Sequence, residues 1–381
     1  MRLALISSLL PHESPGGAEA YVAASARWLA ERHDVTVLTG SEAVLDGVAT
    51  VRLPSLPMLD LESSLPVKLA WHAFDQWLPS VHYAVVHELA RLRPDVVVTH
   101  QPQGLSAGVF TGIRRLGLPH VHTAHDLNLL CVRTTMTRRG EYCGGRCLDC
   151  RVQRFVRGGA VRSHLSRLIG VSRYICRRHV EAGIVPRDRA APVRLGAPPG
   201  QARLRRVEGD AVTLGFIGAM ARHKGVLTLL DAFRRAPAGW RLLLAGSGDL
   251  ASVGAEAAER DPRIEYRGRV EGEAKDRFFD ELDLVVIPSE WEEPATFVAV
   301  EAAVRGLPAV VSDRGGLPET PESAMFHARD PDDLLRAVRW FLGHENLTRA
   351  SERLLARHEE FEWPTHARRV EAVLEEAHAE G

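Results

Sequence analysis

Two glutamates eight positions apart, Glu293 and Glu301, flank the short hydrophobic run in "EWEEPATFVAVEAA" (290–303). A helix that begins near Thr296 would direct its free N–H groups and its positive dipole end toward an anion placed between them. A phosphate at that helix start, with carboxylates beside it that accept hydroxyl groups, would suit a sugar nucleotide. The alternative is that both glutamates are solvated charges, as glutamates on helices usually are.

Two glycine-bearing loops each precede a segment with a helical pattern. In "SPGGAEAYV" (14–22), Gly16 and Gly17 would let the backbone approach a phosphate or a sugar, unless they only form a tight turn. The pattern is not G-x-G-x-x-G, so a nicotinamide cofactor is not indicated. In "FIGAMARHKGV" (216–226), Lys224 either carries its charge to a ligand or is a solvated lysine before a helix.

His125 and Asp126 come directly after an expected strand, in "HTAHDLN" (122–128). A histidine in that place could hydrogen-bond a ligand hydroxyl group, with Asp126 orienting its ring. Against this, a histidine at a strand end is often structural, and we expect His100 and His122 to be so. No pair of carboxylates at glycosidase spacing is evident, so the chemistry is expected to rest on stabilising a departing group.

Four cysteines lie within twenty residues in "CVRTTMTRRGEYCGGRCLDC" (131–150), namely Cys131, Cys143, Cys147 and Cys150. A tetrahedral zinc ion takes that number of thiolates, and the Gly-Gly pair between the second and third cysteine permits a tight turn. A site of four thiolates is closed, so it would stiffen a loop and do no chemistry itself. Disulfides and unligated thiols are the alternatives, and a reducing compartment argues against disulfides.

The segment that follows, residues 151–179, holds many arginines and no acidic residue. It is either a solvated basic surface or a surface for anionic lipid headgroups or a diphosphate-linked acceptor, with Arg154, Arg157 and Arg162 as candidate contacts. The whole chain is balanced, with a formal net charge of −1. No global field therefore attracts nucleic acid or an anionic membrane.

The elements that must position these residues alternate between short apolar runs and longer amphipathic segments over 381 residues. Runs rich in Val, Ile and Leu favour buried parallel strands, and their alternation with helices indicates open sheets covered on both faces. The expected strands are 3–8, 34–40, 94–100, 119–125, 212–218, 240–246, 263–268, 282–289 and 308–313. Ligands of such sheets lie beyond the carboxyl ends of the strands, where the residues above are expected.

The first apolar run is interpreted as a buried strand and not as a secretory signal, because no small-residue cleavage site follows it. No apolar stretch approaches the roughly 20 residues that span a bilayer. We expect a cytoplasmic protein, with peripheral contact at the inner membrane face left open. The pattern breaks at 195–210, which has Pro, Gly and charge without periodicity and is the expected linker. The domains are then 1–198, with a cysteine-rich insertion near 131–150, and 199–381.

The stretch "PSEWEEPATFVAVEAAVRGLPAVVSDRGGLPE" (288–319) resembles the donor-binding segment of family-four retaining glycosyltransferases of the GT-B fold. That family carries E-x7-E, a helix end with glycine and proline, a strand, and Gly-Gly-x-Pro-Glu. The residues in register here are Glu293, Glu301, Ala302, Gly306, Pro308, Gly315, Gly316, Pro318 and Glu319. The resemblance covers nearly the whole chain and implies two doubly wound Rossmann-like domains facing a central cleft. It also implies a terminal helix near 364–378 that returns to the N-terminal domain.

The resemblance implies transfer of a sugar from a nucleotide-diphosphate donor, of UDP or GDP type, to a hydroxyl acceptor with retention of anomeric configuration. The acceptor could be a glycan, a lipid-linked saccharide or a small aglycone. His125 would face the reacting sugar, and Lys224, helped by Arg222, would neutralise the pyrophosphate with no catalytic metal. Glu293 would hold the sugar and Glu301 the ribose. The other donor contacts implied are Gly16, Gly17, Gly218, Arg269, Val270, Thr296, Phe297 and Val298.

Three residues, at two places in the chain, depart from the family pattern. Ala219 stands where the family usually has arginine, and Ala295–Thr296 stand where it commonly has Phe-Gly. The Thr296 side chain is placed where backbone N–H groups usually approach the sugar, so it is expected to influence which sugar is used. Two rival functions remain, a sugar-nucleotide epimerase or hydrolase of the same architecture and a catalytically weak sugar-nucleotide-binding homologue.

Overall fold

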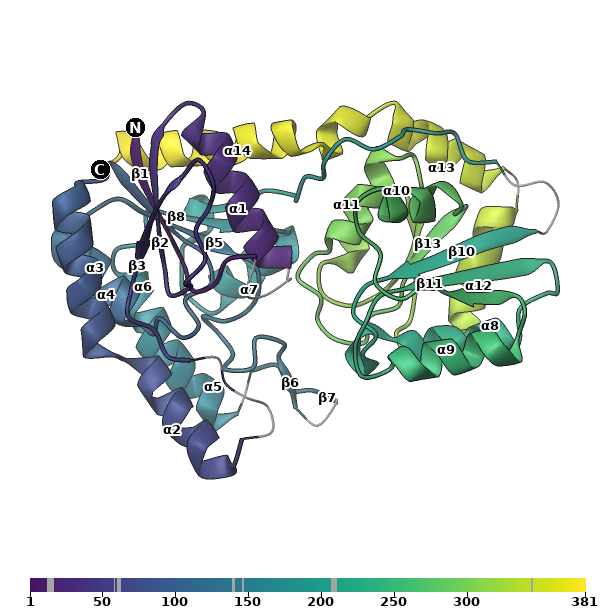
Figure 1. Ribbon diagram of the computed structural model, residues 1–381, viewed down its shortest axis with the longest axis horizontal. Helices are drawn as coiled ribbons and strands as arrows, with labels where there is room; N and C mark the ends of the chain where they lie inside the picture. Colours follow the sequence, from purple (N-terminus) through teal and green to yellow (C-terminus); the bar gives the residue numbers. More distant parts are fainter. Residues whose placement is uncertain are drawn as a thin grey trace. The chain divides into compact units, whose positions relative to one another are not determined.

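The computed structural model describes residues 1–11, 17–57, 59, 63–138, 141–145, 147–206, 211–343 and 345–381. The chain divides into two compact units: unit 1 holds residues 1–193 and 367–381, and unit 2 holds residues 194–366. Each unit contains one open parallel sheet with helices on both faces (Figure 1). The prediction of two doubly wound α/β units is confirmed.

Unit 1 has a seven-stranded sheet in the order β3-β2-β1-β4-β5-β8-β9, and every neighbouring pair is parallel. Its strands are β1 (Arg2–Ser7), β2 (Asp34–Thr39), β3 (Ala49–Arg52), β4 (Val96–Thr99), β5 (His120–Ala124), β8 (Arg167–Gly170) and β9 (Ala190–Pro192). Its helices are α1 (Gly17–Ala30), α2 (Leu65–Gln76), α3 (Pro79–Leu92), α4 (Gly108–Leu116), α5 (Leu148–Gln153), α6 (Gly159–Arg162) and α7 (Arg173–Glu181), with a π-helical turn η1 (Arg154–Gly158) and a 3₁₀ turn η2 (Arg187–Arg189). An antiparallel pair of two-residue strands, β6 (Thr137–Arg138) and β7 (Glu141–Tyr142), lies within the cysteine-rich segment.

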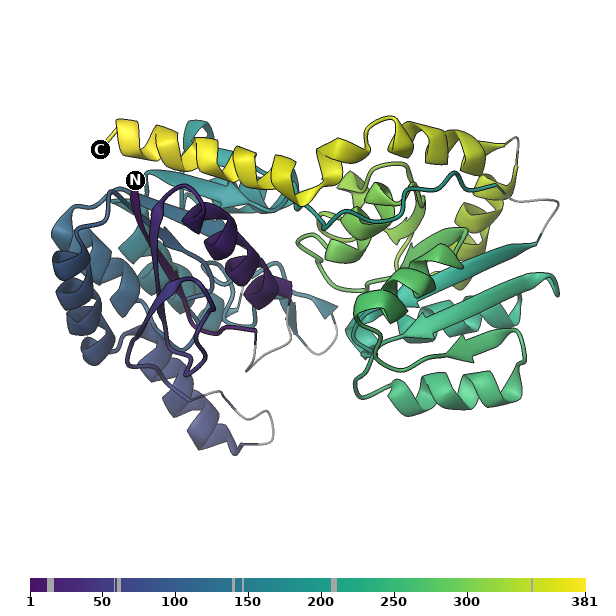
Figure 2. The same ribbon diagram turned by 45° about the horizontal axis from the view of Figure 1, so that its top comes forward.

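Alternate residues of the unit 1 strands are buried on opposite faces of the sheet, as the twofold period of a strand requires. Leu5 packs with Val22 of α1 and with Leu374 of α14 (Trp363–Ala379). Ile6 packs instead with Val85 of α3, in a cluster that α4 also joins. Figure 2 shows α14 as one continuous helix, and its residues from 367 onward belong to unit 1.

Unit 2 has a six-stranded parallel sheet in the order β12-β11-β10-β13-β14-β15. Its strands are β10 (Val212–Ile217), β11 (Trp240–Ala245), β12 (Ile264–Tyr266), β13 (Leu284–Ile287), β14 (Ala309–Ser312) and β15 (Ser323–Phe326). Its helices are α8 (Val226–Arg234), α9 (Ala251–Arg260), α10 (Gly272–Asp280), α11 (Phe297–Val304), α12 (Pro331–Leu342) and α13 (Asn346–Leu355), with 3₁₀ turns η3 (Arg222–Lys224), η4 (Leu317–Glu319) and η5 (His358–Phe361).

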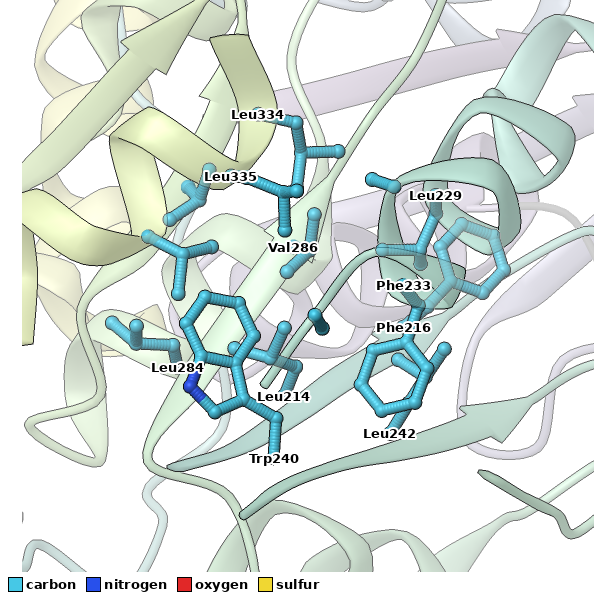
Figure 3. Close-up of a cluster of buried hydrophobic side chains, with 14 of the residues drawn as sticks. Leu214, Phe216, Leu229, Phe233, Trp240, Leu242, Leu284, Val286, Leu334 and Leu335 are labelled. Carbon is cyan, nitrogen blue, oxygen red and sulfur yellow. The ribbon is translucent and has the colours of Figure 1, made fainter. Parts of the chain in front are cut away.

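The larger core of unit 2 lies between its sheet and the helices α8, α12 and α13. Figure 3 shows Leu214 of β10 close to Trp240 of β11 and Phe216 close to Leu242, with Leu334 and Leu335 of α12 above Trp240. A second cluster on the other face joins the sheet to α10 and α11. This second face matters for function, because it fixes the helix that carries Glu301.

The segment expected as a linker is not a free connection. Arg205 is 2% exposed, and its guanidinium donates to the carbonyl oxygens of Asp280 and Leu282 at 2.9 and 2.8 Å. Ala197 forms an isolated parallel bridge with Glu362. Residues 194–206 therefore pack on unit 2, and residues 207–210 of the expected linker lie outside the described residues. In the described part of the chain, no helix is both long enough and apolar enough to cross a bilayer.

Candidate functional site

The loop that carries Lys224 leaves the carboxyl end of β10. It passes Gly218 and the turn η3, after which Gly225 adopts a φ of +75°. A Cβ atom at Gly225 would lie 1.8 Å from the carbonyl oxygen of Pro288, so only glycine permits this approach. The lysine loop is therefore held directly against the loop that follows β13.

Glu293 lies in that second loop and is 5% exposed. Its carboxylate accepts two hydrogen bonds from Lys224 Nζ at 3.0 and 2.8 Å. Ser289 Oγ and Trp291 Nε1 each donate to the same carboxylate at 2.8 Å. The Trp291 ring also lies against the lysine, with Nζ 5.0 Å from the ring centroid.

This arrangement limits what Glu293 can bind. A carboxylate offers about two acceptor positions on each oxygen. Oε2 accepts from all three side chains, whereas Oε1 accepts from Lys224 alone among the described residues. A sugar hydroxyl group could therefore be accepted at Oε1, whereas Oε2 could accept one only if a donor moved away. In the described arrangement Glu293 positions Lys224, and its implied contact with the sugar stays a prediction.

Helix α11 begins where the sequence predicts. The hydroxyl group of Thr296 accepts a hydrogen bond from the Val298 N–H at 3.3 Å, so threonine is the N-cap. Phe297 and Val298 form the partly exposed first turn. At the other end, Gly306 adopts a φ of +68° just past the helix, as expected for a C-terminal glycine.

The glycine pair at 315–316 fixes the approach to this helix. Gly316 N–H donates to the Glu293 carbonyl oxygen at 2.7 Å. Gly315 has a φ of +59°, and a Cβ atom there would lie 2.2 Å from the same oxygen. These glycines therefore hold the backbone of the glutamate loop in place.

Glu301 has one satisfied and one unsatisfied carboxylate oxygen. Oε1 accepts from Lys275 Nζ of α10 at 2.5 Å, whereas Oε2 is buried and has no hydrogen-bond donor among the described residues. A buried carboxylate oxygen without a donor is costly, so this atom is a free acceptor position for a ligand hydroxyl group.

The remaining unit 2 residues lie at the same edge of the sheet. Arg222 is exposed in η3, two positions before Lys224. Beyond β12, the Arg269 guanidinium pairs with Glu271 at 2.7 Å, and Val270 packs on the cluster under α11. The residues that the carboxyl edge of this one sheet brings together are Gly218, Arg222, Lys224, Arg269, Val270, Glu293, Thr296, Phe297, Val298 and Glu301.

In unit 1, His125 follows β5, and its Nε2 lies 3.2 Å from Nδ1 of His100. The Tyr21 ring meets the His125 ring edge-on, with centroids 4.6 Å apart. Burial holds the pKa of His100 well below its usual value, so His125 faces a neutral imidazole. Asp126 accepts from the Asn128 N–H at 2.7 Å, and burial raises its pKa to about 6. The Asp126 carboxylate thus closes a turn, in addition to any role in orienting His125.

Gly17 is the first residue of α1, whereas Gly16 lies outside the described residues. A pocket of about 920 Å³ opens in unit 1 at the carboxyl ends of its first strands. Its lining includes Ser8, Arg52, Trp71, His72, Gln101 and Arg133. Trp71 Nε1 donates to the Pro57 carbonyl oxygen at 2.8 Å, which fixes the indole ring at the pocket wall. Burial lowers the pKa of His72, so this imidazole is neutral near pH 7.

The interpretation of residues 151–179 as one basic surface is wrong at Arg157. Its side chain is fully buried, forms an ion pair with Asp75, and donates to Asn128 Oδ1 at 2.5 Å. Arg167 pairs with Glu380. The segment contributes strand β8 to the sheet interior, and such positions cannot carry free charges. Arg151 and Arg162 remain exposed.

Three residues that act on the unit 2 site were missed from the sequence. Ser289 directly precedes the stretch 290–303 and Trp291 lies within it, so the sequence places both donors within four residues of Glu293. Lys275 gave no signal, because a lysine on an amphipathic helix usually faces solvent. Only the packing of α10 beside α11 brings it to Glu301.

Comparison with known families matches most of the chain in two parts. Residues 15–197 match the family described as Glycosyltransferase Family 4, and residues 211–344 match the family described as Glycosyl transferases group 1. A relative from Klebsiella pneumoniae, described as an uncharacterized 42.6 kDa protein in the cps region, is 24% identical over 335 residues, which cover 84% of this chain and 87% of the relative.

Two solved structures share the fold over the full length. Sucrose-phosphate synthase from Thermosynechococcus elongatus superposes with a TM-score of 0.73 at 20% identity and covers 100% of both chains. HepE from Anabaena in complex with UDP gives a TM-score of 0.73 at 15% identity and covers 99% of this chain and 100% of that one. HepE has also been solved with UDP-glucose. At these identities the likeness shows the fold, which is GT-B.

Proposed function

Because the chain belongs to the GT-B glycosyltransferases with family-four and group 1 domains, we propose that it transfers a hexose from a nucleoside diphosphate sugar to a hydroxyl acceptor with retention of configuration. The observation that carries the donor half of this proposal is the unit 2 site. A held lysine, an α-helix N-terminus and a half-satisfied carboxylate lie at one edge of one sheet. These groups match the diphosphate and the ribose of such a donor.

The chemistry assigned to these residues is stabilisation of the departing diphosphate. Lys224 carries the positive charge, with Arg222 beside it and the first turn of α11 adding N–H donors. Side-chain cations supply what a divalent metal supplies in other transferases, so the reaction is proposed to be metal-independent. With retention, the acceptor attacks the face from which the diphosphate leaves, and the leaving phosphate takes the acceptor proton.

The acceptor is proposed to bind in the pocket of unit 1. Its wall holds an oriented indole ring, a neutral imidazole and the amide of Gln101, which together suit the apolar face and the hydroxyl groups of a sugar. His125 is assigned to a hydroxyl group of the donor sugar or the acceptor. The acceptor is therefore proposed to be a saccharide, free or linked to a carrier.

A binding and turnover experiment tests this proposal. Calorimetry with UDP-glucose, UDP-galactose, UDP-N-acetylglucosamine and GDP-mannose should find a donor, and product analysis across a saccharide panel should find transfer with retention. Glu301→Gln should weaken the nucleotide by about tenfold, in line with loss of a charge-assisted hydrogen bond of about 1.5 kcal/mol. If the wild-type protein binds UDP and 2′-deoxy-UDP equally, Glu301 does not hold the ribose.

The two rival functions give different results in the same experiment. Donor turnover that needs no acceptor would favour an epimerase or hydrolase. Nucleotide binding without transfer to any acceptor would favour a binding homologue. This outcome is worth testing because Ala219 stands where the family usually has arginine.

We also propose peripheral contact with anionic lipid, through the outer face of α2, α5 and η1. These elements lie side by side (Figures 1 and 2), and Gln76 Nε2 donates to Gln153 Oε1 at 2.7 Å between them. Their large apolar side chains are turned outward, with exposed fractions of 62% for Leu69, 74% for Leu148 and 83% for Phe155. Arg151 of α5 is exposed beside them, whereas the two acidic residues of these elements, Asp75 and Asp149, are ion-paired.

Vesicle flotation tests the contact. Binding to vesicles with anionic lipid should fall when Leu148→Ser and Phe155→Ser are combined, and also when Arg151→Glu is introduced. Trp340→Ser is the matched control, because Trp340 is 48% exposed on α12 of unit 2. Equal binding by the variants, or none by the wild-type protein, would contradict the proposal. Arg157 is excluded from this test because its loss would disturb the interior of unit 1.

A further inference from the structure

The four cysteines of the segment 131–150 are brought together by the fold. The Sγ atoms of Cys143 and Cys147 are 3.8 Å apart, those of Cys147 and Cys150 are 3.8 Å apart, and those of Cys150 and Cys131 are 3.5 Å apart. A zinc ion with Zn–S bonds of about 2.3 Å places tetrahedral thiolates roughly 3.8 Å from one another. The three measured separations therefore fit three of the six sulfur–sulfur edges of one tetrahedral zinc site.

The same separations argue against the other interpretations of these cysteines. A disulfide requires sulfur atoms about 2 Å apart, and no disulfide joins any of the described cysteines. An iron–sulfur cluster contains several metal ions and would hold the thiolates further apart than a single ion does. Unligated cysteines usually pack singly as small apolar side chains. Such packing does not explain why four thiols lie next to one another, two of them only half-buried.

The local backbone is shaped for close ligands. Gly144 and Gly145 follow Cys143 with φ values of +59° and +68°, so the chain turns back on itself before Cys147. The Cys143 N–H donates to the Met136 carbonyl oxygen at 2.8 Å, which ties the turn to the strand before it. The cysteines thus come from a turn, the start of α5 and a buried loop residue, Cys131.

The surrounding charges suit a metal bound by four thiolates, which carries net negative charge. Arg154 donates to the Gly145 carbonyl oxygen at 3.0 Å, and Arg178 donates to Met136 Sδ at 3.1 Å. Arg133 pairs with Asp149 at 2.9 Å. Three arginines therefore donate hydrogen bonds within the segment that holds the cysteines. Their positive charges would offset the negative charge of the bound thiolates.

The cluster is continuous with the pocket of unit 1. Val132, Arg133 and Thr134 line that pocket and follow Cys131 directly. Asp149, which holds Arg133, has a carboxylate oxygen within 4.8 Å of the sulfur atoms of Cys147 and Cys150. Asp149 is thus the link between the cysteines and the pocket wall.

We propose that Cys131, Cys143, Cys147 and Cys150 bind one zinc ion, and that this ion fixes residues 132–134 as a wall of the unit 1 pocket. Zinc binding releases thiol protons to solvent, and no electron is transferred. The site is closed, so its effect on the pocket is structural. The metal site stands independently of the proposed transferase function, and only its effect on acceptor binding rests on that function.

Metal analysis of reduced, purified protein tests the site. Stoichiometric zinc is expected in the wild-type protein and in Cys176→Ser, a matched control because Cys176 is a buried cysteine outside the cluster. Cys147→Ser and Cys143→Ser should lose the zinc, and Asp149→Asn should keep it. Absence of zinc from the wild-type protein, or equal zinc in the cysteine variants, overturns the site. Loss of zinc from Asp149→Asn overturns the four-thiolate ligand set.

Hydrogen exchange tests the effect on the pocket without relying on catalysis. Amides 131–150 should exchange at least about tenfold faster after zinc is removed from the wild-type protein by chelation, whereas the β10–α8 region of unit 2 should not change. If transfer is found, the KM for the acceptor should rise by about tenfold on chelation, with the KM for the donor unchanged. Unchanged exchange in 131–150 overturns the role in the pocket wall, even if zinc is present.

Discussion

Glu293 was identified as a candidate ligand contact, but in the structure its carboxylate binds other side chains of the protein. Its spacing from Glu301 marked it as a ligand contact, yet its four hydrogen bonds come from protein donors. The consequence is that Lys224 is held in a fixed place before any ligand arrives, so less conformational entropy is lost on binding. The lysine is an electrostatic group prepared for a developing negative charge.

The lysine can be tested by graded substitution. Lys224→Met should lower kcat/KM by about 10²–10³, as does loss of one preorganised donor elsewhere. It should also lower the free energy of unfolding by about 1–3 kcal/mol, because a buried carboxylate loses two of its hydrogen bonds. Trp291→Phe keeps an aromatic ring beside Lys224 Nζ and removes one hydrogen bond to Glu293. It should therefore lower kcat/KM by about tenfold or less, and the free energy of unfolding by about 1 kcal/mol or less.

Steady-state kinetics and urea unfolding of the two variants make this measurement. A Trp291→Phe enzyme as impaired as Lys224→Met would show that the indole N–H, and not the ring, controls the lysine. Normal kinetics in Lys224→Met would remove the lysine from the mechanism.

At the scale of elements, the sequence predicted long-range placement well where strands were strongly apolar. Strands β1, β2, β4, β5 and β10 to β14 lie where Val, Ile and Leu runs predicted them. The strands β3, β8, β9 and β15 were missed, because their sequences ATVR, RLIG, AAP and SAMF contain few Val, Ile and Leu residues. The ends of α11 were predicted from Thr296 and Gly306 through capping chemistry alone.

Other features could not be predicted because they depend on contacts distant in sequence. The burial of Arg157 depends on Asp75, which lies 82 positions away, and nothing in the sequence indicates that these two residues pair. The free oxygen of Glu301 depends on where α10 places Lys275. Pattern analysis assigns such residues to solvent by default, and only packing decides otherwise.

The N-cap of α11 gives a prediction at this scale. Thr296→Ala should cost about 1 kcal/mol of stability, whereas Thr296→Gly should cost only a few tenths of a kcal/mol, because glycine is a tolerable N-cap. Thr296→Gly also opens space at the helix start, so the ratio of kcat/KM values between two donor sugars should change. Chemical unfolding and donor competition measure the two effects. If donor preference is unchanged in Thr296→Gly, the threonine is a cap and nothing more.

At the scale of the molecule, unit 1 holds an unusual number of buried histidines. Burial lowers the pKa of His164 and His179 to about 4 and those of His100, His120 and His122 well below the usual value. These rings are neutral in the folded state and become protonated near pH 6.5 in the unfolded chain. Their contribution to stability is therefore complete above pH 6.5 and is lost as the pH falls toward 4.

As the pH is lowered, this protein should accordingly begin to lose stability at a higher pH than protonation of carboxylates alone would cause. Each such histidine contributes a slope of about 1.4 kcal/mol per pH unit below its unfolded pKa. The carboxyl groups whose pKa values burial raises, Asp126 to about 6 and also Glu19 and Asp283, act in the opposite sense but are fewer than the buried histidines. Urea unfolding between about pH 7 and about pH 5 measures the slope. His164→Phe should flatten it by one histidine's share, and a flat profile in the wild-type protein would contradict the expectation.

Gly225 carries no functional group, yet it limits how this protein can be redesigned. Its missing Cβ lets the lysine loop meet the carbonyl of Pro288. Gly225→Ala must move one main chain or the other, so it should impair turnover about as much as Lys224→Met while leaving every charged side chain in place. In a saturation library selected for new donor sugars, position 225 should stay invariant while positions such as 296 diversify. The backbone contact at Gly225 thus fixes the position of Lys224, and side-chain substitutions at other positions would not change it.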